Sequence, residues 1–354
     1  MEQTINKSNF NLNKTSLEGI RRVVNPTYYK PNAWLAFLHT LVGISFHAIA
    51  LYVSYIVWKE EIYWAYFFTW FLAGTSVTSL FVLGHDCAHQ AFLKSNKLND
   101  ALGHFFFLFS FYPYYAWKYS HNAHHRHTNL LKINSKDIYY DNAWIPLTTS
   151  QYKVLKRFQP KKALLYKLGR LFPPFGSFMH NILTHYFPQK YNDSQRKKVI
   201  FSYFILGLFA ILIISGIYYF TNSIFAIFHF YILPGIFFQF WMSLYTYQHH
   251  TSENIQFYDE SNWNSYKGQI HGTLNSLSPS WLSFLHHGID VHTPHHLSTA
   301  IPCYYLKKAY EDLKNSPYRE DILEQKLSFT YYIKQILNCH LWDEKQRRYV
   351  KFFN

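Results

Sequence analysis

Three long stretches of this 354-residue chain contain no Asp, Glu, Lys or Arg: residues 31–58, 62–84 and 199–252. A helix needs roughly 20 apolar residues to cross a hydrocarbon core about 30 Å thick. The first two stretches are long enough for one crossing each. The third is long enough for two crossings, with a break near 221–223. Buried helices of soluble proteins rarely lack charge over such lengths, so we expect an integral membrane protein.

The predicted fold is a single all-α domain, residues 1–354, that crosses the membrane four times. The predicted transmembrane helices span residues 33–58, 62–84, 199–220 and 224–247. The connections at 59–61 and 221–223 are very short, so each pair of helices should form a hairpin with its tip on the same side. The longer segments, which would form a helical cap, then share the opposite side: residues 1–32, 85–198 and 248–354.

Positive charge indicates which side is cytosolic. Of the 34 Lys and Arg residues only Lys59 lies at a hairpin tip, and Lys and Arg are enriched in cytoplasmic loops. Both termini and the cap should therefore be cytosolic. Residues 1–32 are polar and do not have the pattern of a cleaved signal peptide. The net charge of +14 suits anionic lipid headgroups, whereas a nucleic-acid partner is disfavoured because the charge is not gathered on one compact soluble domain.

Residues 101–117 are also uncharged and aromatic, but this stretch is short for a crossing and contains Pro113. A crossing here would put His121 and His85 on opposite sides of the membrane. We therefore expect 101–117 to be re-entrant or interfacial, with its irregular backbone covered by protein.

Three histidine clusters follow these apolar segments: His85-Asp86-Cys87-Ala88-His89, His121-Asn122-Ala123-His124-His125 and His292-Thr293-Pro294-His295-His296. Side chains at i and i+4, or at i, i+3 and i+4, share one face of a helix. One such pair arises often by chance, but three in one chain do not. Eight imidazoles exceed the four ligands of one zinc ion and suit two adjacent metal ions, for which iron is a good candidate.

The chain has three cysteines, at 87, 303 and 339, and no CxxC motif. Three cysteines cannot all pair, so we expect reduced thiols on a cytosolic face and no disulfide framework.

The three histidine clusters, called histidine boxes below, and the residues that flank them resemble those of the membrane-bound fatty acid desaturases. The resemblance is specifically to the delta-12/omega-3 acyl-lipid branch. The similarity rests on the first box, on Trp117–His125, on Tyr247–Thr251, and on Gly288–Pro302, which reads GIDVHTPHHLSTAIP. It covers roughly residues 30–345. Ala88 stands where this branch commonly has Gly, a small-for-small change that removes no ligand.

The resemblance implies a non-haem di-iron centre that uses O2 to remove two hydrogens from a membrane-lipid acyl chain and leaves a cis double bond, at the delta-12 or a neighbouring position. The ligands carried over by matching position are His85, His89, His121, His124, His125, His292, His295 and His296. We assign a ninth ligand to His250, with His249 as the open alternative. His271, His286 and His287 are better explained as surface residues or as partners of ligands.

Metal-bound imidazoles usually donate their second N–H to a carboxylate or carbonyl. Four carboxylates near the boxes are candidates for this role: Asp86, Asp137, Glu253 and Asp290.

Electrons must come from another protein, since the sequence has neither a cytochrome b5 haem motif nor a ferredoxin-like cysteine pattern. We expect a separate ferredoxin-like carrier, and a multi-pass protein of a bacterial inner membrane. Hydroxylation of a lipid, alkane or carotenoid at the same boxes is the alternative reaction, which only product analysis distinguishes. A metal transporter is a weaker alternative, because its ligands would lie near the bilayer midplane.

Overall fold

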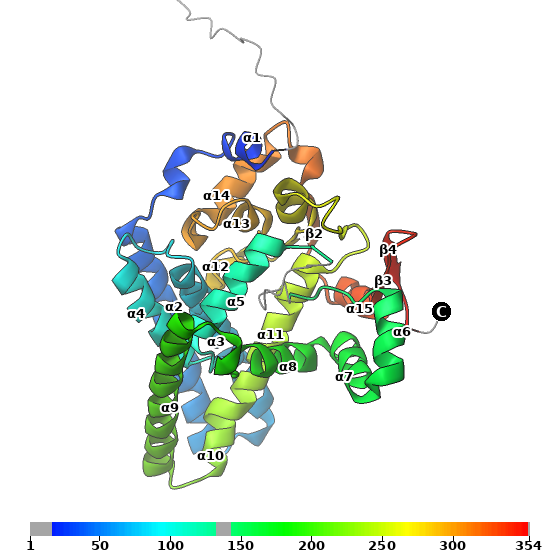
Figure 1. Ribbon diagram of the computed structural model, residues 1–354. Coiled ribbons are helices and arrows are strands. Elements are labelled where there is room, and N and C mark those ends of the chain that lie inside the picture. Colours follow the sequence, from blue (N-terminus) through cyan, green and yellow to red (C-terminus); the bar gives the residue numbers. More distant parts are fainter. Residues whose placement is uncertain (1–15, 132–142, 353–354) are drawn as a thin grey trace, which may run out of the picture.

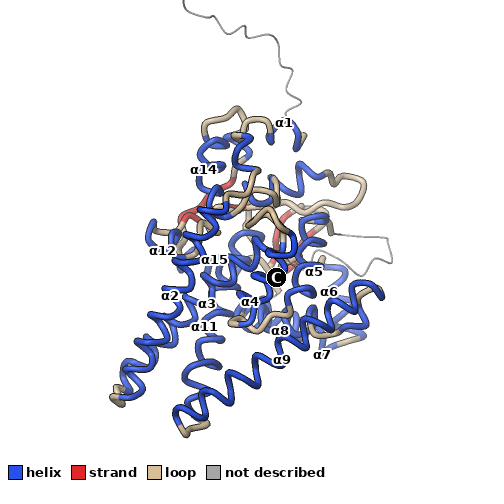
Figure 2. The backbone as a smooth tube through the Cα atoms, turned by 90° about the vertical axis from the view of Figure 1, so that its left-hand side faces the viewer, coloured by secondary structure: helices blue, strands red, loops and turns tan. Residues whose placement is uncertain are grey.

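The computed structural model describes residues 16–131 and 143–352, and their helices form two tiers (Figure 1). One tier consists of long helices: α2 (Ala33–Lys59), α3 (Tyr66–Ala88), α9 (Asp193–Thr221), and α10 (Phe225–Ile227) continuing into α11 (Leu233–His250). The shorter elements form the other tier, and Figure 2 shows the same division after a quarter turn.

Four helices of the described chain are long and apolar enough to cross a membrane: Ala33–Lys59, Tyr63–Ala88, Asp193–Thr221 and Phe225–His250. Helix α9 exposes large apolar side chains, as Ile211 at 65% and Phe220 at 84% exposure illustrate, whereas most of Tyr63–Ala88 is buried. Such extensive apolar surface needs a lipid or protein partner. The four predicted spans are thus found, but α3 and α11 continue beyond the predicted ends at 84 and 247.

Asparagine side chains delimit two of these helices. The Asn32 side chain accepts hydrogen bonds from the backbone N–H groups of Trp34 and Leu35 at the start of α2. Asn192 caps the start of α9 in the same way, and Asn222, with a left-handed φ of 49°, follows its last residue. Asparagine satisfies the free N–H groups at a helix start and tolerates the left-handed conformation at a helix end.

Helix α3 lies at the centre of the long helices, in contact with both α2 and α11. Gly74 permits the close approach of α11. A Cβ atom at this position would lie 2.5 Å from Phe237 Cβ and 2.7 Å from the Pro234 carbonyl oxygen. The packing of α3 against α11 therefore requires a residue without a side chain here.

The segment 101–117 comprises the second half of α4 (Asn96–Leu108), a turn, and the first residues of α5 (Tyr114–His127). Asp100 holds the two helices together, because its carboxylate accepts hydrogen bonds from Tyr114 Oη, Tyr115 Oη and Lys118 Nζ at 2.7–2.9 Å. The 13-residue α4 is shorter than a membrane crossing.

Helices α6 (Thr149–Phe158), α7 (Pro160–Leu171) and α8 (Pro173–His185) extend to one side of the long helices (Figure 1). Gly169 and Gly176 allow α7 and α8 to pack closely, since a Cβ on Gly176 would lie 2.6 Å from the Gly169 carbonyl oxygen. Large apolar side chains of α7 and α8 remain exposed, among them Leu164 and Phe178.

The C-terminal part of the second tier mixes helices with two small sheets. The helices are α12 (Ser280–Leu285), α13 (Thr293–Leu297), α14 (Cys303–Lys314) and α15 (Phe329–Asn338). Strand β1 (Leu274–Leu277) pairs in parallel with β2 (Leu323–Lys326), and β3 (Leu341–Asp343) pairs antiparallel with β4 (Arg348–Val350). The prediction of an all-α fold was wrong in this part of the cap. Strands of three or four residues are too short to show an alternating pattern.

Short elements complete the chain. Helix α1 (Leu17–Arg21) lies at the described N-terminal end. Turns of 3₁₀ or π type occupy Pro26–Tyr29, Tyr63–Ala65, Pro188–Lys190, Phe228–Ile232, Lys267–His271 and Arg319–Asp321. The three cysteines are free, as predicted, and each of them is buried.

Candidate metal centre

Four segments that are distant in sequence bring the histidine boxes together. His85 lies in the last turn of α3 and His89 caps that helix. His121, His124 and His125 lie on α5. His292 precedes α13, which carries His295 and His296, and His249 and His250 end α11. The polar ends of the apolar helices α3 and α11 thus meet α5 and α13 of the second tier.

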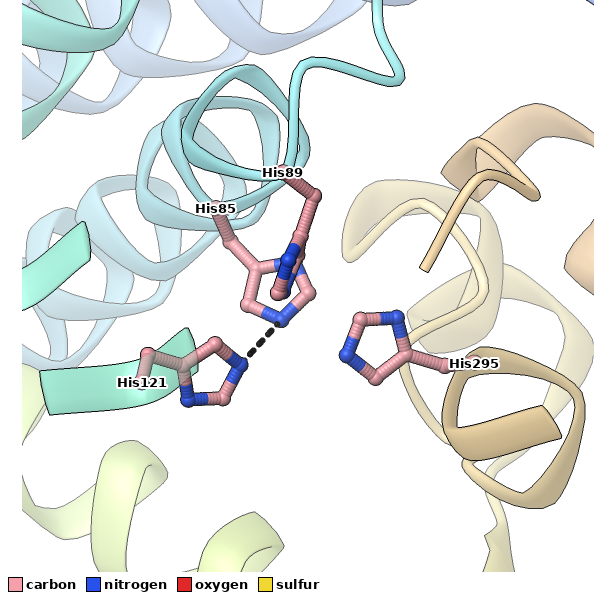
Figure 3. A group of neighbouring side chains, drawn as sticks. All are labelled: His85, His89, His121 and His295. Carbon is pink, nitrogen blue, oxygen red and sulfur yellow. Dashed lines mark hydrogen bonds between the residues drawn. The ribbon is translucent and has the colours of Figure 1, made fainter. Parts of the chain in front are cut away.

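One group consists of His85, His89, His121 and His295, whose rings converge from α3, α5 and α13 (Figure 3). Each ring offers a nitrogen, and these four nitrogens lie within 4.8 Å of one another. The Nε2 atoms of His85 and His121 are 3.1 Å apart.

A second group consists of His124, His250, His292 and His296, again with one nitrogen each within 4.8 Å. All four are buried. The Nε2 atoms of His250 and His292 are 2.9 Å apart, and those of His124 and His296 are 3.3 Å apart.

His125 lies between the two groups. Its Nε2 is 3.2 Å from Nε2 of His121 and 2.9 Å from Nε2 of His295 in the first group. Its ring centre is 4.3 Å from that of His296 in the second group. The structure therefore brings all nine predicted histidines into one cluster.

The hydrogen bonds of the outer ring nitrogens orient three of the rings so that they could bind a cation. Nδ1 of His85 lies 3.2 Å from Asp86 Oδ1, that of His250 lies 3.3 Å from the Gly272 carbonyl, and that of His296 lies 2.7 Å from Gln269 Oε1. An oxygen acceptor requires N–H at Nδ1, and a neutral imidazole has only one N–H. Nε2 of each ring therefore carries a lone pair that faces other imidazoles.

At 2.9–3.3 Å each of these lone pairs either accepts an N–H from the facing ring or shares a cation with it. Two nitrogens bound about 2.0–2.1 Å from one metal ion are about 2.9–3.4 Å apart at angles between 90° and the tetrahedral value. The spacing of these rings matches that of ligands on a shared ion.

Burial and the neighbouring imidazoles lower the pKa of His121, His295 and His296 well below its usual value. These rings are therefore neutral near pH 7. Neutral imidazole is the form that binds a metal ion.

The carboxylates expected beside the ligands are only partly where we predicted them. Asp86 contacts His85 and also accepts a hydrogen bond from the backbone N–H of Cys303. Asp290 instead accepts from Ser278, Ser283 and Lys307, and Glu253 pairs with Lys334 at the surface. The prediction was wrong for Asp290 and Glu253, because closeness to a box in sequence does not set the direction of a side chain. Asp137 lies outside the described residues.

The sequence did not point to Gln269, which is buried beside the second group. Its Oε1 accepts from His296 Nδ1 and from Thr128 Oγ1, while its Nε2 donates to the His125 carbonyl. Gln269 thus orients the ring of His296 and holds the backbone of α5 at His125. It belongs to no box and lies 27 residues from His296, so no motif could reveal it.

His249, the open alternative to His250, stacks on His292 with ring centres 4.1 Å apart. Its Nε2 is buried without a hydrogen-bond partner in the described part of the chain. His250 rather than His249 belongs to the second group.

An apolar cavity of about 480 Å³ adjoins the cluster and is lined by His85, His121, His124, His250 and His292. Phe81, Trp117 and Met242 are among its apolar wall residues. Sites for apolar ligands are typically concave and lined in this way, with a few polar groups. The rings therefore face a space that suits a hydrocarbon chain.

Comparison with known proteins agrees with this geometry. The family model for fatty acid desaturase matches residues 62–327. A protein named sn-1 oleoyl-lipid 12-desaturase from Picosynechococcus is 36% identical over 80% of this chain and 78% of its own length. A protein of the same name from Synechocystis is 32% identical over 88% of this chain and 84% of its own. The chloroplastic omega-6 fatty acid desaturase of Spinacia oleracea is 32% identical over 80% of this chain and 60% of its own. The chain therefore belongs to the fatty acid desaturase family and is an oxidoreductase.

Proposed function

We propose that the protein is a membrane-bound acyl-lipid desaturase that converts oleoyl chains to linoleoyl chains. The observation that carries this proposal is the pair of four-imidazole groups that face one apolar cavity. The similarity to proteins named sn-1 oleoyl-lipid 12-desaturase supports the choice of substrate and bond.

We assign iron to the two histidine groups, one ion to each, with His125 between them. Imidazole is a suitable ligand for iron, and neutral ligands add no negative charge to the site. Two bound irons would supply the O2-dependent oxidation that protein side chains cannot perform. The cap and the long helices hold the rings rigidly, and the Nδ1 contacts of His85, His250 and His296 fix their orientation.

The cavity residues bind and orient the substrate. Phe81, Trp117 and Met242 line the wall beside the histidines, so an acyl chain in the cavity would place its methylene groups next to the rings. Apolar walls also exclude water, which limits side reactions. Orientation of a bound chain against a fixed reacting centre can account for a large share of a rate enhancement.

For the membrane we propose one domain, residues 1–354, whose four long helices form two hairpins. The loop between α4 and α5 would lie at the bilayer edge as a re-entrant element, which agrees with the 3.1 Å approach of His121 to His85. The site and both termini would be cytosolic, in a bacterial inner membrane. Epitope tags at both ends should be protected from external protease in intact cells. An exposed C-terminal tag would contradict this topology.

We further propose a separate ferredoxin-like electron donor. The net charge of +14 would favour the approach of an acidic carrier, since complementary charge accelerates encounter between proteins.

The function is tested by expression in a host that makes oleate, followed by fatty-acid methyl ester profiling. We expect linoleate to appear with the wild-type chain and to be absent with the variant His121→Ala. A hydroxylated product would favour the hydroxylase alternative. An unchanged profile, with the protein inserted and iron-loaded, would contradict the proposal.

A further inference from the structure

Arg170 is a buried cation whose hydrogen-bonding capacity is largely unused. It lies on α7 and is 2% exposed. Its Nε donates to Tyr166 Oη at 3.3 Å, and the Tyr349 hydroxyl interacts with the guanidinium group, whereas Nη1 and Nη2 make no hydrogen bond of normal geometry among the described residues. A guanidinium group has five N–H donors. Removing such a group from water without partners is costly.

Three tyrosine rings surround the guanidinium group. The rings of Tyr166, Tyr247 and Tyr349 have their centres 5.7–5.9 Å from Cζ. Cation–π contacts offset part of the cost of burying the charge, but they leave the N–H donors of Nη1 and Nη2 unsatisfied. The tyrosine cage holds the charge in place without neutralising it.

Arg170 lines the same cavity as the histidine cluster. One face of α7 contributes Lys162, Leu165, Tyr166, Gly169 and Arg170 at helical spacing. Lys162 and Leu165 are also exposed, so the cavity opens along α7. No Asp or Glu occurs among its described lining residues. The cavity thus combines apolar walls with a buried positive charge.

We propose that Arg170 binds an oxyanion at the polar end of the acyl substrate. The matching ligand is an amphiphile whose chain occupies the apolar part and whose phosphate, sulfonate or carboxylate accepts from Nη1 and Nη2. Arginine suits these groups because its planar donors can bind two oxygens at once. This inference rests on the proposed desaturase function and narrows its substrate to lipids with an anionic polar end.

The test measures lipid binding to the iron-loaded, full-length protein in mixed micelles by native mass spectrometry. The probes are dioleoyl phosphatidylglycerol, sodium oleate and dioleoylglycerol, which carry a phosphodiester, a carboxylate and no anion, respectively. We expect Arg170→Gln to weaken binding of an anionic probe by about tenfold or more, the scale of a charge-assisted hydrogen bond. Binding of dioleoylglycerol should stay the same. Arg157→Gln, which removes an exposed charge on the adjacent α6, is the matched control and should change no affinity.

The anionic probe that loses affinity identifies the source of the oxyanion, as a headgroup phosphate or an unesterified chain. Equal weakening of all three probes would show a purely structural role for Arg170 and overturn the proposal, as would unchanged binding. If Arg170→Gln does not fold, Arg170→Lys retains the charge but presents fewer donors. Compared with the wild type, Arg170→Lys should bind phosphatidylglycerol or oleate more weakly and dioleoylglycerol equally well. Wild-type affinity of Arg170→Lys for all three probes would again overturn the proposal. Absence of linoleoyl product from wild-type protein would refute the desaturase function, independently of these binding results.

Discussion

Replacement of Gln269 by leucine should selectively weaken one of the two proposed metal sites. The amide oxygen of Gln269 lies 2.7 Å from Nδ1 of His296 and holds that ring with its Nε2 lone pair toward the second histidine group. Leucine has a similar volume and cannot accept this hydrogen bond. The other tautomer of His296 then becomes accessible, and its ring can rotate.

The expected loss follows from the role of this contact. Removing a partner that orients a metal-bound histidine typically lowers metal affinity about 10–100-fold, which corresponds to about 1.4–2.7 kcal/mol. The first group keeps its own anchor, the Asp86 contact to His85. One iron should therefore be removed by a chelator whose affinity for iron is about 10–100-fold lower than the wild type requires. The other iron should be retained under the same conditions.

The measurement is equilibrium dialysis against a graded series of chelators, with iron per chain determined by mass spectrometry. Gln335→Leu is the matched control. Gln335 is equally buried and donates to the Thr251 carbonyl, but its hydrogen bond involves no imidazole. Gln269→Glu retains the oxygen acceptor for His296 but loses the donor to the His125 carbonyl, so it should recover only part of the affinity. If Gln269→Leu kept both irons as firmly as the wild type, or released both together, the two histidine groups would not be oriented independently and the reasoning would be refuted.

The other predictions concern ligands and packing. His250→Ala should lose about one iron per chain, whereas His249→Ala should keep both, as measured by elemental analysis of purified protein; the reverse pattern would make His249 the ninth ligand. His295→Ala should abolish linoleate formation and lower iron content while the protein still inserts, and an active variant would remove this residue from the ligand set. Gly74→Ala should destabilise the protein by about 1–3 kcal/mol or more through overpacking, because the new Cβ would lie 2.5 Å from Phe237 Cβ. Gly207→Ala, which has no neighbouring atom within 4 Å, should have a normal thermal unfolding midpoint, and equal midpoints for the two glycine variants would contradict this packing argument.

The sequence predicted the four long helices because uncharged runs of more than about 20 residues are rare outside membrane-spanning helices. Helices α3 and α11 continue beyond the predicted spans, since hydropathy marks where lipid contact stops and not where helical hydrogen bonding stops. This difference matters for the site, because the extra turns carry His85 and His250 on rigid helix rather than on loops.

The spacing within each histidine box predicted which imidazoles share one face of a helix. The predicted topology placed all the boxes on the same side of the membrane. Neither could supply contacts that depend on tertiary packing. Gln269 approaches His296 because a π-helical turn and α13 pack together. Arg170 approaches the cavity because α8 packs against α11 and α7 packs against α8, which places Arg170 against Tyr247 of α11. Single residues of this kind leave no periodic signal.

The continuation of α3 and α11 past their apolar segments has a practical consequence. His85 and His250 are rooted in helices whose outer surfaces are built for hydrocarbon, while their partner histidines belong to the opposite tier. Eleven residues separate Gly74 from His85, about 16 Å of helix, so a 5° tilt at this crossing would shift the ring by roughly 1.4 Å. A fragment that lacks these helices should lose this alignment, and detergents that let the helices splay should dismantle the proposed metal centre before the chain unfolds.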